Sequence, residues 1–126
     1  MHLAPLHDRI EQAARRLPAD PALQAQFKGC ALNTIETTTE RLEDGTTFVF
    51  TGDIPALWLR DSSAQVRHYL LLAADVPEVQ ELVAGLIRRQ MQYILLDPYA
   101  NAFNKGPTGG GHPGDLTCLL YTSDAA

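Results

Sequence analysis

The segment from Pro77 to Leu96 constrains the fold more than any other part of the chain. Its apolar residues recur at the three- and four-residue spacing of a single helical stripe. They are Val79, Leu82, Val83, Leu86, Ile87, Met91, Ile94 and Leu95. Pro77 suits the first turn of a helix, and Asp97-Pro98 ends it. The pattern predicts a long amphipathic helix, whose stripe requires more apolar partner surface than the rest of the chain readily supplies.

Two shorter helices are expected near the N-terminus. Residues 6–17 carry apolar side chains at helical spacing, and Pro18 ends that run because its ring cannot continue a helix. Asp20 followed by Pro21 is a favourable pair for an N-cap and a first turn. A second helix should therefore start there and end near Cys30.

A β-hairpin is expected next, because residues 34–51 are rich in threonine, isoleucine, phenylalanine and valine. The dipeptide Asp44-Gly45 interrupts this run and tolerates the positive φ angles of a tight turn. The pattern predicts that Ile35–Leu42 pairs with Thr46–Phe50.

An extended stretch and a third helix should follow the hairpin. Alternation along the stretch places Trp58 and Arg60 on one side and their leucine neighbours on the other. Asp61 or one of the two serines after it can cap the third helix. The apolar residues of that helix are Val66, Tyr69, Leu70 and Ala73.

Composition narrows the classes of function. The 126 residues, with 10 basic and 15 acidic side chains, carry a formal net charge of -5 and no basic cluster, which argues against nucleic acid as a partner. The longest apolar run, Tyr69–Ala74, is too short to span a membrane, and the N-terminus lacks the apolar block of a secretory signal. We therefore expect at most about one domain, soluble and cytoplasmic, with no membrane partner; no oligomeric state follows.

The two cysteines, Cys30 and Cys118, allow at most one disulfide. Neither cysteine has zinc-ligand spacing, so no metal and no cofactor is expected.

The densest chemistry lies in the run Thr51–Ser62. Sugars are bound by aromatic rings that stack on their C–H faces and by charged side chains that bond adjacent hydroxyls. Asp53, Trp58, Arg60 and Asp61 fit such a site. Three alternatives remain open: Trp58 in the core, Arg60 and Asp61 as a surface ion pair or helix cap, and Asp53 as a turn residue.

A second polar cluster, Asp97–Asn104, lies where the long helix should end, as a pocket-lining loop or a set of Asx turns. The glycine-rich segment Gly106–Gly114 follows, and no strand is expected to lead into it. It lacks the phosphate-loop pattern. His112 with Asp115 offers too few ligands for a metal, so a loop histidine that donates one hydrogen bond, to a substrate for example, is the better interpretation.

The run TGDIPALWLRDSSAQV from Thr51 onward resembles the hallmark of glycoside hydrolase family 125, the metal-independent exo-acting α-1,6-mannosidases. The preceding segment from Cys30 and the following DPYANAFN and Gly111-His112 segments resemble the same family, over about residues 27–117. The resemblance implies a mainly α fold: the N-terminal part, about a third, of an (α/α)6 barrel, with one β-hairpin.

The resemblance also implies the chemistry. Members of this family hydrolyse with inversion: one carboxylic acid protonates the leaving oxygen while a second carboxylate activates water. Both carboxylates are expected outside this chain, so the fragment itself should be inactive. The substrate implied is a mannose-containing oligosaccharide or N-glycan, and the source a bacterium. The residues expected to bind the terminal mannose are Asp53, Trp58, Arg60, Asp61, Asn104 and His112.

The resemblance stops at Cys118. The last nine residues, 118–126, look like the translation of a transposase-type sequencing adapter. Residues 1–117 are therefore expected to be the partial glycosidase domain. Two other functions remain open: a different (α/α)6-barrel glycosidase such as an α-glucosidase, and a non-catalytic helical binding module that folds by itself.

Overall fold

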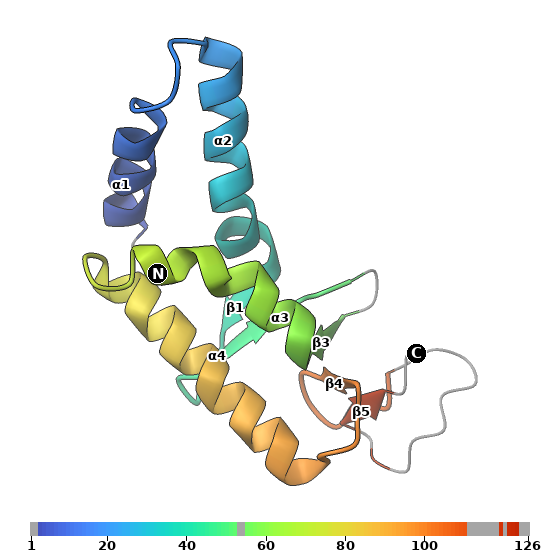
Figure 1. The fold of residues 1–126 in the computed structure, drawn as a ribbon. Helices are drawn as coiled ribbons and strands as arrows, with labels where there is room; N and C mark the ends of the chain where they lie inside the picture. Colours follow the sequence, from blue (N-terminus) through green and yellow to red (C-terminus); the bar gives the residue numbers. More distant parts are fainter. Residues whose placement is uncertain (1–2, 53–54, 111–118, 120, 124–126) are drawn as a thin grey trace.

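The computed structural model describes residues 3–52, 55–110, 119 and 121–123. Figure 1 shows helices α1 and α2 side by side at one end and strands β3, β4 and β5 at the other, with α3, most of α4 and the strand β1 between them. None of the helices in the described part of the chain is long and apolar enough to cross a membrane.

The N-terminal helices form an antiparallel pair, α1 (Ala4–Ala14) and α2 (Pro21–Asn33). Helix α1 buries Leu6, Ile10 and Ala14, so the predicted spacing is confirmed, although the helix ends before Pro18. Asp20 caps α2 as predicted: its Oδ1 accepts hydrogen bonds from the backbone N–H groups of the second and third helical residues at 2.9 and 3.3 Å.

The predicted end of α2 near Cys30 is wrong. The helix continues to Asn33 and then into a π-helical turn, η1 (Thr34–Thr38). Three threonine hydroxyls favour this turn, since those of Thr37, Thr38 and Thr39 each donate to the carbonyl four residues earlier, at 2.6 to 2.9 Å. Side-chain bonding thus keeps helical a segment whose composition favours a strand.

The β-hairpin is therefore shorter than predicted. Strand β1 (Thr39–Arg41) pairs antiparallel with β2 (Thr47–Val49), and Thr39 lies opposite Val49. The predicted turn at Asp44-Gly45 is confirmed: Gly45 has a φ of 75°, and Asp44 Oδ1 accepts from the N–H and the hydroxyl of Thr46. These two bonds, the hydroxyl's above all, lower the pKa of Asp44.

The extended stretch is strand β3 (Ala56–Trp58), and α3 (Leu59–Val66) begins immediately after it. Trp58 is the N-cap residue and no side chain caps the helix, so the predicted cap at Asp61 or the serines is wrong. Arg60 belongs to α3, so it does not share a strand face with Trp58. Helix α3 continues into a 3₁₀ helix, η2 (Arg67–Leu71), in place of one long third helix.

Helix α4 (Pro77–Leu96) has the predicted bounds but buries only part of its predicted stripe. The buried residues are Val79, Leu82, Val83, Gly85, Leu86 and Tyr93. The other four residues of the stripe, Ile87, Met91, Ile94 and Leu95, are exposed, in agreement with the expectation that the chain supplies too little partner surface for it. The helix therefore carries a second apolar face.

A small sheet has the strand order β3-β4-β5, with β4 (Ala102–Asn104) in the middle and β5 (Thr122–Ser123) at one edge. Both pairings are antiparallel. Strand β4 leads directly into the glycine-rich segment, so the expectation that no strand precedes that segment is wrong. Its short length gives no alternating pattern, and its partner β3 lies far away in sequence.

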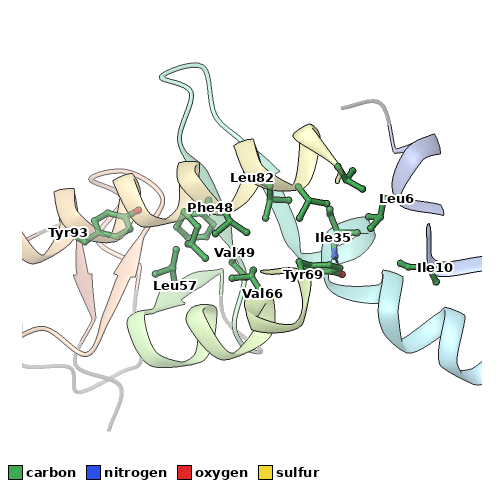
Figure 2. Packing of buried hydrophobic residues seen from close by; sticks show 14 of the residues in the cluster. Leu6, Ile10, Ile35, Phe48, Val49, Leu57, Val66, Tyr69, Leu82 and Tyr93 are labelled. Atoms are coloured by element: carbon green, nitrogen blue, oxygen red, sulfur yellow. Dashed lines mark hydrogen bonds between the residues drawn. The ribbon is translucent and has the colours of Figure 1, made fainter. Parts of the chain in front are cut away.

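The core is a row of buried side chains between α4 and the other elements (Figure 2). Phe48, Val49 and Leu57 lie under the middle of α4, and the row extends to Leu6 in α1. Inside it, Tyr69 Oη accepts a hydrogen bond from the backbone N–H of Ile35 at 3.1 Å. This bond ties η2 to the π-helical turn.

Candidate functional site

The loop between β2 and β3 is closed by one threonine. Thr51 N–H and its hydroxyl both donate to the carbonyl of Ala56, at 3.1 and 3.3 Å, and the same hydroxyl accepts from Trp58 N–H at 2.9 Å. A Cβ on Gly52 would lie 3.5 Å from the indole Cζ3, so the Trp58 ring packs against this loop. The predicted residue Asp53 belongs to the loop but lies outside the described residues.

The register of β3 and β4 places two predicted site residues on one face of the sheet. Ala56 lies opposite Asn104, and Trp58 lies opposite Ala102. Directly paired residues share a face and neighbours along a strand alternate, so Trp58 and Asn104 point to the same side. Leu57 and its partner on β4 occupy the other side and are fully buried in the core.

Arg60 and Asp61 lie in the first turn of α3, directly after the Trp58 end of β3. They form the surface ion pair that the sequence left open, with Arg60 Nη2 3.4 Å from Asp61 Oδ1. The Arg60 side chain is 89% exposed, and a contact this long between exposed groups is weak. Both charges are therefore free to bond a ligand.

Gln90 of α4 fixes the turn that carries these charges. Its Nε2 donates to the Leu59 carbonyl at 3.1 Å and lies 2.9 Å from the hydroxyls of Ser62 and Ser63. Sequence reasoning missed Gln90 and Thr51. Gln90 carries a recognisable signal: it is a polar residue four positions after Leu86, within the apolar stripe, and such a residue needs a specific partner.

Asn104 is almost fully buried, with 3% of its surface exposed. Its Nδ2 donates to the Gly110 carbonyl at 2.6 Å, and its backbone N–H donates to the Tyr121 carbonyl at 2.7 Å. The Asn104 amide thus holds the middle of the glycine-rich segment, at Gly110, against the sheet. His112, further along that segment, lies outside the described residues. At the other end of the cluster, Asp97 forms the Asx turn that was one of the two alternatives, accepting from Tyr99 N–H at 3.0 Å.

Two side chains of α4 support the Asn104 end of β4. Tyr93 Oη donates to the Asn104 carbonyl at 2.7 Å, and its ring stacks on Phe103 with centroids 4.5 Å apart. Arg89 lies over the same tyrosine ring and donates to the Lys105 carbonyl at 2.6 Å. Burial raises the pKa of Tyr93 to about 12, so the hydroxyl remains a donor at neutral pH.

Metal-binding side chains do not gather in the described part of the chain: no group of three or more His, Cys, Asp or Glu residues there could hold an ion. The described site residues offer an aromatic ring, a cation and an acid at the Trp58 end of β3, and a buried amide at the opposite end of the β3–β4 pair.

Comparison with known proteins gives concordant matches. The family model for metal-independent α-mannosidases matches residues 20–117. A structure from Streptococcus pneumoniae, of a metal-independent α-mannosidase in a non-productive complex with α-1,6-mannobiose, is 40% identical and has a TM-score of 0.85. The match covers 93% of this chain and 28% of that one.

A fission yeast protein, the meiotically up-regulated gene 157 protein of Schizosaccharomyces pombe, is 36% identical over 106 residues. That alignment covers 81% of this chain and 21% of the yeast protein. The chain therefore spans less than a third of the length of these relatives, as a segment of an α/α-barrel protein. Since the family model covers most of it, the chain belongs to glycoside hydrolase family 125, the metal-independent α-mannosidases.

Proposed function

We propose that this chain is part of a longer enzyme that removes terminal α-1,6-linked mannose from a mannose-containing oligosaccharide or N-glycan. One observation carries the proposal: the S. pneumoniae structure that matches this chain with a TM-score of 0.85 holds α-1,6-mannobiose. An exo-acting enzyme must recognise the non-reducing sugar through several hydroxyls at once, and the polar groups around β3 and β4 suit that task.

The residues of this chain bind the terminal sugar. The Trp58 ring offers a surface for the C–H face of a hexose, and Arg60 and Asp61 offer a donor and an acceptor for neighbouring hydroxyls. Asp53, in the loop that Thr51 closes, contributes a carboxylate that accepts hydrogen bonds from sugar hydroxyls. Asn104 and His112 complete the subsite, with the Asn104 amide holding the segment that carries His112.

Bond cleavage is assigned to the rest of the enzyme. In an inverting glycosidase, an acid protonates the leaving oxygen while a base activates water from the opposite face of the ring. We assign neither role to Asp53, Asp61 or Asp115. The chain alone should therefore bind sugar weakly at best and release no mannose.

The C-terminal residues are proposed not to belong to the enzyme. The family match ends at residue 117, and residues 118–126 resemble a translated sequencing adapter. In this chain Thr122–Ser123 pairs with the free edge of β4, a place that any short extended segment can take. We also propose that the enzyme comes from a bacterium and is located in the cytoplasm.

The experiment begins with recovery of the complete open reading frame. The full protein and residues 1–117 are assayed on α-1,6-mannobiose in the presence of EDTA, with an α-1,4-linked glucose disaccharide as the control substrate. We expect mannose release by the full protein alone, undiminished by EDTA, with β-mannose as the first product by NMR. Release of glucose in preference to mannose would replace this proposal with an α-glucosidase.

A further inference from the structure

The first peptide of α3, between Leu59 and Arg60, is held by side-chain donors. The Leu59 carbonyl accepts a hydrogen bond from the hydroxyl of Ser62 at 3.1 Å and from that of Ser63 at 2.8 Å. It also accepts from Gln90 Nε2 at 3.1 Å. A carbonyl oxygen has two lone pairs, so these donors saturate it. The plane of this peptide, and with it the direction in which the chain enters Arg60, is therefore fixed.

Gln90 is the member of this network that comes from another element. Its Nε2 also lies 2.9 Å from each of the two serine hydroxyls. Both hydroxyls direct their single proton to the Leu59 carbonyl, so they accept from the amide. Because a carbonyl oxygen only accepts, the nitrogen of the Gln90 amide, and not its oxygen, must face Leu59. The network therefore depends on the glutamine as a donor, a property that neither leucine nor ionised glutamate provides.

Side-chain packing between α3 and α4 is incomplete beside this network. A groove of about 510 Å³ separates α3 and η2 from α4, and Ser63 and Gln90 both line it. Within the described part of the chain, the side-chain hydrogen bonds that join α3 to α4 all come from Gln90. The position of the first turn of α3 relative to α4 therefore depends on this one side chain.

The helix that carries Gln90 is itself fixed in the core. Leu86, about one turn before Gln90, and Tyr93, about one turn after it, are each 2% exposed. Tyr93 also bonds the Asn104 carbonyl at 2.7 Å. Gln90 and Tyr93 are three residues apart, a rise of about 4.5 Å, and lie on the same face of the helix. One face of α4 thus holds both parts of the proposed sugar site, the α3 turn through Gln90 and strand β4 through Tyr93.

We propose that Gln90 is a positioning residue of the sugar site. It holds the Leu59–Arg60 peptide so that the side chains of Arg60 and Asp61 leave the first turn of α3 toward the same ligand. Arg60 is 89% exposed and its 3.4 Å contact with Asp61 is weak, so their own interaction does not fix them. The inference rests on the proposed function of these two charges, and it adds a residue that acts through them.

Kinetics of the complete enzyme test the effect on the sugar. A misplacement of about 1 Å can cost roughly 100-fold in rate, so Gln90→Leu should lower kcat/KM for α-1,6-mannobiose by at least about tenfold. Gln80→Leu is the matched control, since Gln80 is an exposed residue of the same helix, and it should leave kcat/KM unchanged.

A mutant cycle separates positioning from a merely structural role. When Arg60→Ala and Asp61→Ala are already present, Gln90→Leu should change kcat/KM by less than about twofold, because the groups that it positions are gone. An equal loss in both backgrounds would overturn the proposal, and so would near-parental activity of Gln90→Leu alone.

A spectroscopic measurement on this chain tests the positioning without any activity. Leu59-Arg60 is the only Leu-Arg dipeptide of the sequence, so labelling leucine carbonyls with ¹³C and arginine nitrogens with ¹⁵N gives a single NMR cross-peak for this peptide. A carbonyl carbon resonates further downfield when its oxygen accepts hydrogen bonds. We expect the Leu59 resonance to move upfield in Gln90→Leu and in the isosteric Gln90→Glu, and to stay in place in Gln80→Leu.

The outcomes distinguish this inference from the proposed function. If the complete enzyme releases no mannose, the proposed function fails, and the carbonyl resonance alone decides whether Gln90 holds the peptide. An unchanged resonance in both Gln90 variants overturns the inference whatever the enzyme does.

Discussion

Gly85 lies where α4 crosses strand β2, and its missing side chain allows the close packing of these two elements. A Cβ at this position would lie 2.5 Å from Thr47 Oγ1, 3.0 Å from the Thr47 backbone nitrogen and 3.2 Å from the Gly45 carbonyl oxygen. Two of these three atoms belong to the hairpin backbone. Gly85→Ala therefore requires α4 and the hairpin to move apart.

Two opposing effects set the magnitude of this substitution. Alanine in a helix interior is favoured over glycine by about 1 kcal/mol. Overpacking of a core commonly costs roughly 1–3 kcal/mol, and the upper end applies here because backbone atoms must shift. We expect Gly85→Ala to lower the free energy of unfolding by about 2 kcal/mol.

Urea unfolding followed by far-ultraviolet circular dichroism measures this change in the full chain. Gly29→Ala is the matched control, because Gly29 is also helical but has no atom within 4 Å of a Cβ, so this variant should gain stability. Adding Thr47→Ala to Gly85→Ala removes the nearest of the three atoms and should restore part of the loss. A Gly85→Ala variant as stable as the parent would refute the packing argument.

Three further predictions concern a helix cap, a buried tyrosine and the exposed charges. Asp20→Ala should cost about 1 kcal/mol in urea unfolding, because it removes the acceptor at the start of α2; an unchanged midpoint would contradict the capping role. Tyr93 has its pKa raised by burial from about 10 to about 12, so its neutral form is favoured in the fold and stability should decline as pH rises through this window. Tyr93→Phe should weaken that alkaline decline and should also destabilise at neutral pH through loss of the bond to Asn104; a parental pH profile would count against the assignment. Arg60→Ala and Asp61→Ala should leave unfolding unchanged but reduce kcat/KM sharply in the complete enzyme, and near-parental activity in both would remove them from the sugar subsite.

Elements with local signals could be predicted from the sequence. Asp20 and Pro21 specify the start of α2, Asp44-Gly45 specifies the hairpin turn, and Pro77 starts α4. In each case neighbouring residues form the interaction that decides the conformation. The sequence therefore contains the whole physical cause within a few positions.

Elements decided by distant contacts could not be predicted. The threonine-rich segment suggests a strand from Ile35, but it forms a π-helical turn in which threonine hydroxyls bond carbonyls four residues earlier. The distant Tyr69 hydroxyl holds this turn through the backbone N–H of Ile35. The pairing of β3 with β4 joins two three-residue strands that are separated by α3 and α4. Both halves of the α4 stripe are apolar, and only packing distinguishes the buried half from the exposed half.

The sequence identifies several residues of the candidate site, but it does not reveal the contacts that hold them in place. The run from Thr51 to Asp61 identified Trp58, Arg60 and Asp61, and the structure places them at the junction of β3 and α3. That Trp58 and Asn104 share a sheet face follows from strand register, and the role of Gln90 follows from helix packing. No pattern of neighbouring residues in the sequence indicates either relation.

The position of Trp58 has a practical consequence, because it is the only tryptophan of the chain. Its half-buried indole lies against Gly52, at the edge of the loop that Thr51 closes. The emission of this single fluorophore therefore originates from one defined place, beside the residues proposed to hold a sugar. A spectral shift on adding a saccharide would report an event at this loop without any attached label, and its dependence on concentration would give a binding isotherm.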